Sequence, residues 1–288
     1  MPDFPIIDTH VHLWDPQHFA MPWLRGDALL ERRYDVEAYA AQTQGVAIEA
    51  AVYIEVGVAE PYALLEPTWV VEQAQQDPRL QGIVAHAPLE YGEQVRAYLD
   101  ALVKIDPRVK GVRRNLQGES DPQFCLQPAF VRGVQLLAEY GLSFDICIVS
   151  HQLPSIVQLV QQCPATAFIL DHSGKPDIKE HGLDPWRGQI QELAAYPNVY
   201  CKISGLVTEA DHAHWSPEDL APYINHVLAA FGEERVVFGS DWPVALLASD
   251  YVRWVETLDT VTTHLTPSAK RKLWAENARR FYRLPPSA

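Results

Sequence analysis

Two histidines separated by one residue, His10 and His12, come at the end of the apolar run that opens the chain. Side chains two residues apart in an extended strand point to the same side, so both imidazoles can face one point. Such a pair can chelate a metal ion or hold a polar substrate. The alternative is two surface histidines at the start of a loop. The neighbouring Asp8 and the position at a strand end favour the functional interpretation.

Polar residues end two later apolar runs in the same way. Leu170 is followed by Asp171 and His172, and Phe238 is followed closely by Asp241. A carboxylate at the end of a buried run is costly unless it is paired, bound to a metal or used in a reaction. Asp241 is therefore the strongest single candidate. The alternatives are a turn capped by Asp171 and a helix N-cap at Asp241.

Short β-rich runs alternate along the chain with longer amphipathic segments. This alternation is typical of parallel βα units, and these elements must position the residues above. Strands are expected at Pro5–His10, Ala50–Val56, Gln81–Ala87, Val109–Asn115, Ser143–Ile148, Ala167–His172, Val199–Ser204 and Val236–Asp241. Helices are expected at Val36–Gln44, Pro67–Gln76, Glu93–Ile105, Pro128–Tyr140, Leu153–Gln162, Pro185–Ala195, Pro217–Phe231, Ser249–Leu258 and Pro267–Phe281. This pattern predicts an α/β fold, a (β/α)8 TIM barrel in a single domain over residues 1–288, rather than an open doubly wound sheet.

In such a barrel the active site is built at the C-terminal ends of the strands. Closure makes the first and last strands neighbours, which places His10 and His12 beside Asp241. Two long loops, Trp14–Arg33 and Gly174–Trp186, leave predicted strand ends, so we expect both to cover the site.

Composition excludes several classes of function. The formal charge of −14, from 23 Lys and Arg against 37 Asp and Glu, argues against a nucleic-acid partner. No apolar stretch is long enough to cross a bilayer, and no targeting segment is visible. The four cysteines form no C-x-x-C pair, which argues against a thiolate zinc site and fits a reducing compartment. We therefore expect a cytoplasmic protein without nucleic-acid or membrane partners, and its oligomeric state stays open.

Three motifs carry a family resemblance: D-T-H-V-H at 8–12, D-H-S-G-K-P at 171–176 and G-S-D-W-P at 239–243. They resemble the amidohydrolase superfamily and, within it, the amidohydrolase-2 branch and its sugar lactonase group of L-fuconolactonase-like and rhamnonolactonase-like members. The stretches K-G-V-R at 110–113 and N-A-R-R-F-Y at 277–282 match as well. The resemblance therefore extends from the first strand to the last helix.

The resemblance implies roles for the matching residues. It implies that His10, His12, His172 and Asp241 bind one divalent metal ion, with Zn2+ as the first candidate. Some lactonases of this branch work without metal. It also implies that Asp241 is the general base and that Arg113 contacts the substrate. Many relatives carry a lysine or glutamate that bridges two metals after strand four, and this chain has Arg113 and Arg114 there. A second metal is therefore not expected.

The expected reaction is the opening of a sugar lactone in a sugar-catabolic role. Asp241 would take a proton from the attacking water, and His172 or His151 would protonate the leaving alkoxide. A bound zinc would polarise the carbonyl, and without it Arg113 and the histidines would stabilise the oxyanion. Substrate contacts are expected from side chains near the other strand ends: Glu55, His86, Arg113, His151 and Trp242. Structural roles remain the alternative for Glu55, His86 and Trp242.

Three other functions compete with the lactonase. A zinc-dependent decarboxylase of the same branch, acting on a small cyclic carboxylic acid, would use the same residues. A deoxyribonuclease barrel also begins with D-T-H-x-H, but the −14 charge argues against it. The third is a non-catalytic sugar-acid binding protein. Asp145, Lys202 and Ser204 either line the site or form a hydrogen-bonded layer inside the barrel.

Overall fold

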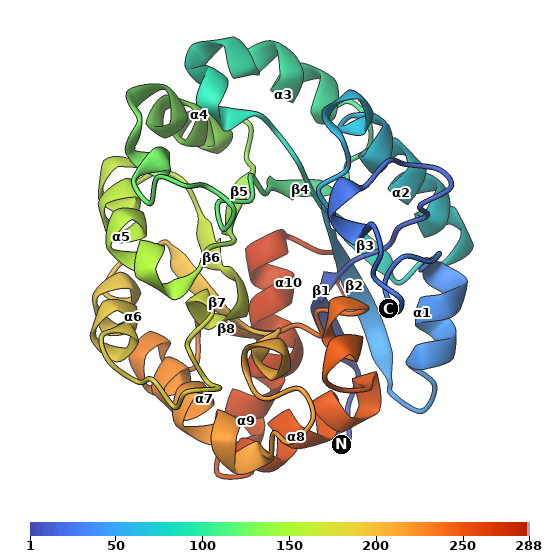
Figure 1. Ribbon diagram of the computed structural model, residues 1–288, viewed down its shortest axis with the longest axis vertical. Helices are drawn as coiled ribbons and strands as arrows, with labels where there is room; N and C mark the ends of the chain where they lie inside the picture. Colours follow the sequence, from blue (N-terminus) through green and yellow to red (C-terminus); the bar gives the residue numbers. More distant parts are fainter. Residues whose placement is uncertain (287–288) are drawn as a thin grey trace.

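The computed structural model describes residues 1–286 and contains one sheet of eight parallel strands in the order β1 to β8. The strands are β1 (Ile6–Val11), β2 (Ile48–Ile54), β3 (Leu80–Ala85), β4 (Val109–Val112), β5 (Ser143–Ile146), β6 (Phe168–Leu170), β7 (Val199–Ile203) and β8 (Val236–Phe238). Each pairs with the strand next in sequence, which is the order of a (β/α)8 barrel and confirms the predicted fold (Figure 1). Most of the strands end earlier than predicted: β6 stops before Asp171, and β8 before Asp241.

Helices follow the strands and surround them as a ring (Figure 1). They are α1 (Val36–Gln42), α2 (Leu65–Gln76), α3 (Arg96–Leu102), α4 (Pro128–Glu139), α5 (Leu153–Gln162), α6 (Trp186–Ala194), α7 (Pro217–Phe231) and α8 (Tyr251–Val261), with α9 (Pro267–Arg271) and α10 (Asn277–Tyr282) at the end. The predicted last helix is interrupted by a π-helical turn, Lys272–Glu276. Over residues 1–286, no helix combines the length and the apolar character needed to cross a membrane.

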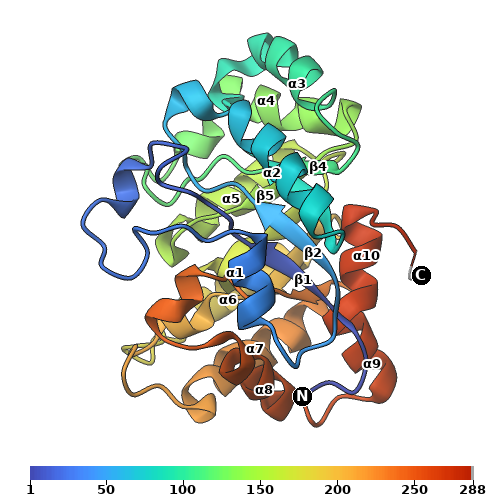
Figure 2. The ribbon, with the colours of Figure 1, turned by 90° about the vertical axis from the view of Figure 1, so that its right-hand side faces the viewer.

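The C-terminal helix closes one end of the barrel. The Phe281 ring packs on Tyr200 at the start of β7, with ring centroids 4.8 Å apart, and Arg283 donates to the Lys110 carbonyl at the start of β4. Tyr282 reaches inside and donates to Asp145 at 2.7 Å. Figure 2 shows α10 and the loop that follows β1 on opposite sides of the barrel. The end at which the strands finish is therefore the end left open.

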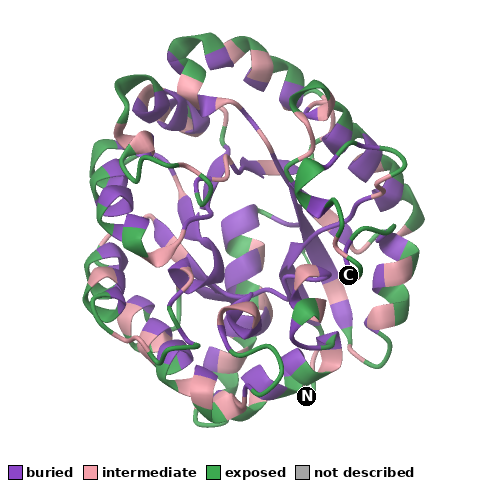
Figure 3. Ribbon diagram, viewed as in Figure 1, coloured by how far each residue is buried: buried purple, intermediate pink, exposed green. Residues whose placement is uncertain are grey.

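Burial follows this architecture. The strands are buried along most of their length, and the helices are buried on the faces that cover them and exposed outside (Figure 3). Alternate residues of β2 face different cores: Ala50, Val52 and Ile54 pack in the barrel interior with α10, and Ala51 and Tyr53 pack against the helices. This period of two is the one expected of a barrel strand.

Backbone hydrogen bonds join β1 to the segment after β8. Asp241 N donates to the His10 carbonyl at 2.9 Å, and His12 N donates to the Trp242 carbonyl at 2.8 Å. These backbone bonds fix the positions of the two histidines relative to Asp241 independently of any side-chain contact.

The Asp8 carboxylate supports the same junction from the outer side of the barrel. One oxygen accepts from Ser240 N at 2.8 Å and from His10 N at 3.2 Å. The other accepts from the Tyr39 and Tyr251 hydroxyls, both at 3.0 Å. Burial raises the pKa of Asp8, while the hydrogen bonds from Ser240, His10 and Tyr251 lower it in part. Asp8 therefore holds the seam of the barrel together rather than entering the site.

We predict that Asp8→Ala destabilises the protein by about 3 kcal/mol, because several buried donors lose their acceptor at once. Urea denaturation followed by circular dichroism measures the change. Asp3→Ala is the control, because Asp3 is exposed and such substitutions change stability by about 0.5 kcal/mol or less. Equal midpoints for the two variants would contradict the role of Asp8.

Candidate active site

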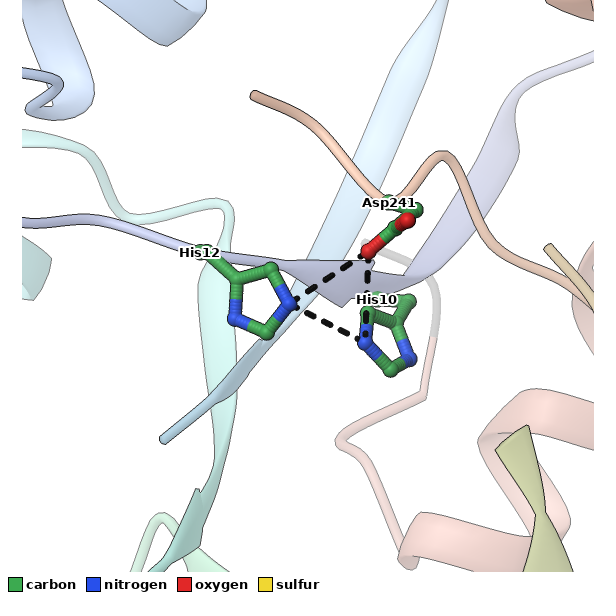
Figure 4. A group of neighbouring side chains, drawn as sticks. All are labelled: His10, His12 and Asp241. Carbon is green, nitrogen blue, oxygen red and sulfur yellow. Dashed lines mark hydrogen bonds and ion pairs between the residues drawn. The ribbon is translucent and has the colours of Figure 1, made fainter. Parts of the chain in front are cut away.

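Three ligand-type atoms meet at the open end of the barrel (Figure 4). The His10 and His12 Nε2 atoms are 3.2 Å apart, and Asp241 Oδ1 lies 3.6 Å from the first and 3.4 Å from the second. His172 joins them, with its Nε2 atom 3.9 Å from Asp241 Oδ1. The structure thus brings together the four residues that were predicted from their positions at the strand ends.

The backbone at His172 and at Asp241 is left-handed, and this conformation directs both side chains toward the cluster. His172 and Asp241 have φ of 52° and 60°, a region that is unfavourable for residues with a Cβ. Gly205 leaves them room, because a Cβ at that position would lie 2.5 Å from His172 Nδ1 and 3.0 Å from Asp241 Oδ2. Retained strain of this kind concentrates at functional sites.

Hydrogen bonds at the far ring nitrogens orient the imidazoles. His12 Nδ1 donates to the Ile54 carbonyl at 2.8 Å, so in the neutral ring the Nε2 lone pair faces the cluster. His172 Nδ1 pairs with the Ser204 hydroxyl at 3.0 Å. His10 Nδ1 has two partners: Lys202 Nζ at 3.2 Å and Asp171 Oδ1 at 3.4 Å.

A network of charges lies behind His10, inside the barrel. Lys202 Nζ is 2.7 Å from Asp145 and 2.8 Å from Asp171, and all three side chains are completely buried. Burial alone would lower the pKa of Lys202, but the two carboxylates raise it above its usual value. Lys202 is therefore a fixed ammonium group, and the hydrogen-bonded layer considered from the sequence is the arrangement found.

Arg113 extends this network toward the cavity. Its Nε donates to Glu55 Oε1 at 2.7 Å, and its guanidinium also reaches Asp171 at 3.5 Å. The second Glu55 oxygen accepts from Gly57 N at 2.7 Å. Burial would raise the pKa of Glu55, but Arg113 holds it below its usual value. Glu55 therefore orients Arg113, and both of its oxygens are engaged within the protein.

The electrostatic environment favours an ionised Asp241 beside neutral His10 and His172 rings. Burial lowers the pKa of both His10 and His172 well below the ordinary value, so both are neutral at pH 7. Burial would raise the pKa of Asp241, but His172 and His12 bring it below the usual value. Asp241 is thus a carboxylate able to accept a proton or to bind a cation.

The cluster fits one zinc ion. Tetrahedral N and O ligands lie about 2.0–2.1 Å from zinc, which puts neighbouring ligand atoms about 3.3 Å apart. The separations of 3.2, 3.4 and 3.6 Å among His10, His12 and Asp241 agree with that spacing. His10 offers its Nε2 lone pair when the ring proton is on Nδ1, where Asp171 can accept it. His10, Asp171 and His172 form another group of possible ligands, but the Lys202 ammonium beside Asp171 already supplies a cation there.

A cavity of about 310 Å³ opens onto these residues. Its volume suits a small ligand. Both loops predicted to cover the site contribute to it, the first through Trp14 and Trp23 and the second through Lys175. The side chains named above that line it are His12, Arg113, His172 and Asp241.

Four of the five predicted substrate contacts do not line this cavity. Glu55 is engaged with Arg113, and Trp242 is packed between Tyr34 and Tyr39 at ring-centroid distances of 5.3 Å. His86 is half-buried beside the strand end, and His151 is exposed in the turn Ser150–Gln152. Arg113 alone of the five lines the cavity.

Other residues in and behind the site were missed or left undecided. Sequence does not single out Lys175, which falls within the predicted loop Gly174–Trp186, and it leaves Asp171 as a possible turn cap. Lys202 and Asp145 each stand in a short strand of otherwise mostly apolar residues, V-Y-C-K-I and S-F-D-I. A charge in such a run needs a buried partner, and the two opposite charges are each other's partners. Sequence could have indicated that pairing.

Comparisons with known proteins agree with this geometry. The family model for amidohydrolases matches residues 7–284. The chain is 31% identical to an L-fucono-1,5-lactonase of Burkholderia multivorans, over 98% of this chain and 97% of the relative. It is 23% identical to an L-rhamnono-gamma-lactonase of Scheffersomyces stipitis, over 99% and 100%. A crystal structure of a Burkholderia multivorans amidohydrolase with bound zinc superposes with a TM-score of 0.88 at 30% identity, covering 98% of this chain and all of that one.

A buried glutamate, Glu66, interacts with Glu55. Glu66 of α2 accepts from the Tyr53 hydroxyl at 2.7 Å and from Val56 N at 2.8 Å, both through Oε1. Burial, together with the charge of Glu55, raises the pKa of Glu66 from 4.5 to about 8. Glu66 therefore keeps its proton in the folded protein at pH 7 and loses it in the unfolded chain.

This difference predicts a pH-dependent stability. Because the folded pKa is the higher one, the contribution of Glu66 is fully present below pH 4.5 and is lost as the pH rises toward 8. Glu66→Gln should remove that dependence and stabilise the protein at pH 8 by a few kcal/mol, since one pKa unit is about 1.4 kcal/mol. Urea denaturation of both proteins from pH 5 to pH 8 measures it. A constant difference across this range would contradict the raised pKa.

Proposed function

The chain belongs to the amidohydrolase family, and on that premise we propose that it hydrolyses the ring ester of a sugar lactone to the open-chain sugar acid. The observation that carries the proposal is the Asp241 carboxylate, which lies within 3.9 Å of the His10, His12 and His172 rings beside a cavity of about 310 Å³. The relatives named as L-fucono-1,5-lactonase and L-rhamnono-gamma-lactonase support this substrate class over the decarboxylase alternative. The role would be the breakdown of a sugar such as fucose or rhamnose in the cytoplasm, without a nucleic-acid or membrane partner.

Asp241 is the base in this mechanism. It takes a proton from the water that attacks the lactone carbonyl carbon, which forms a C–O bond and leaves a negative oxygen. The proton then passes through His172, 3.9 Å from Asp241, to the ring oxygen as its bond to the carbonyl carbon breaks. His172 serves here rather than His151, which lies outside the cavity. The acid formed releases its remaining proton to solvent and becomes a carboxylate.

One Zn2+ would be held by His10, His12 and Asp241, with His172 beside it. When bound it would polarise the carbonyl and lower the pKa of water. Arg113 contributes independently of the metal, because its guanidinium lines the cavity and is held in place by Glu55. A route that relies on fixed protein donors is thus available to the same residues.

We predict that Asp241→Asn lowers turnover by at least about 10³-fold while the fold is kept, because the amide cannot accept the proton of water. A panel of aldonolactones, followed by acid release with and without chelator, measures the rates. Asp211→Asn is the control, since Asp211 is an exposed carboxylate that does not line the cavity. Near-normal rates for Asp241→Asn would remove this residue as the base, and no hydrolysis of any lactone by the unaltered protein would refute the proposed function.

We also predict that the protein, stripped by chelator and reloaded, takes up a single zinc ion per chain. His12→Ala should lower its zinc affinity by at least about 10-fold, because one of the protein ligands is lost. Elemental analysis and competition with a zinc-binding dye measure stoichiometry and affinity. His86→Ala is the matched control, a histidine outside the cluster. Equal affinities for the two variants would refute the assigned ligands.

A further inference from the structure

Two cations, Arg113 and Lys175, line the cavity among the residues that the structure describes. The charge of Arg113 is already balanced, because Glu55 lies 2.7 Å from it and Asp171 lies 3.5 Å from it. Most of its donors are also occupied, since the Glu55 carbonyl and the His10 ring accept from the same guanidinium. Arg113 can touch a substrate but has little charge left to offer it.

Lys175 has fewer partners. Its Nζ atom donates to the amide oxygen of Gln117 at 2.6 Å, and the carboxylate of Glu209, 3.8 Å away, forms an ion pair with it that lies beyond hydrogen-bond distance. An ammonium group has three donors, so Lys175 retains donor capacity toward the cavity. Gln117 is neutral and exposed, which makes it a partner that a charged ligand can replace.

The backbone around Lys175 supports a function independently of these contacts. Residues 172–175 are all left-handed, with φ of 52°, 52°, 71° and 51°. Such a turn is unfavourable for residues other than glycine. The same turn directs His172 to Asp241 and places Lys175 on the cavity wall. Strained backbone of this kind clusters at functional sites, which supports a role for the Lys175 amine there.

We propose that Lys175 is the cation that binds the charge developed by the reaction. It leaves Gln117 to donate to the carbonyl oxygen as water attack makes that oxygen negative. It then binds the carboxylate of the sugar acid after the ring C–O bond has broken. This assignment rests on the proposed function, and it makes Lys175, rather than Arg113, the main electrophilic group supplied by the chain.

The test uses two substitutions of Lys175 with chelated, full-length protein. Lys175→Met should lower kcat/KM for L-fucono-1,5-lactone about 10²-fold, the usual effect of losing one oxyanion donor. Calorimetry should show that the Lys175→Met variant binds L-fuconate at least about tenfold more weakly than the unaltered protein, because a charge-assisted hydrogen bond is lost. Lys175→Gly should show both losses with an unchanged or higher melting temperature, because glycine suits a left-handed position.

Lys179→Met is the matched control, an exposed lysine of the same loop that does not line the cavity. It should retain both rate and affinity. Lys175 variants that bind L-fuconate and hydrolyse the lactone like the unaltered protein would overturn the proposal, as would a loss of melting temperature without a loss of affinity. Binding of L-fuconate through Lys175 without hydrolysis of any lactone would refute the proposed reaction and support the carboxylate site. Normal hydrolysis by both Lys175 variants would refute the role of Lys175 alone.

Discussion

A chain of buried charges inside the barrel is the constraint on which the site depends. Lys202 lies between Asp145 and Asp171, and Asp171 in turn faces Arg113, which is held by Glu55. No member can move without exposing an opposite charge to an apolar interior, where an unpaired charge costs several kcal/mol, about 3–5 on loss of a partner. The network adds little net stability, but it restricts the strand ends to one arrangement.

That restriction reaches the reacting groups through His10. Its Nδ1 atom faces both Lys202 and Asp171, so the ring plane is fixed whether the ring accepts or donates at that atom. The backbone bonds between β1 and the segment after β8 then set Asp241 beside the histidines. Because the charge network and these backbone bonds are rigid, they hold Asp241, His10 and His12 at fixed separations.

Sequence patterns predicted the barrel and the four clustered residues for the same reason: parallel strands end at one edge, so polar residues at those ends must meet. What lies beyond a strand end is harder to predict. Glu55 and Trp242 stand at strand ends yet point into packed surroundings, because side-chain direction there depends on partners such as Arg113 and Tyr39. The π-helical turn in the last helix also depends on tertiary contacts, because Asn277, just after it, donates to the Glu233 and Val236 carbonyls.

The left-handed residues show how the site and the fold compete. Within residues 1–286, six residues other than glycine have positive φ, and three of them, His172, Lys175 and Asp241, line the cavity. At the end of a barrel strand the chain must turn outward toward a helix while its side chains stay turned inward. Left-handed backbone achieves both, but each residue with a Cβ is disfavoured there by about 1–2 kcal/mol. Glycine at these positions would make the protein more stable, but it could not carry an imidazole, an amine or a carboxylate. The backbone strain at the mouth of the barrel is therefore the consequence of placing functional side chains at these turns.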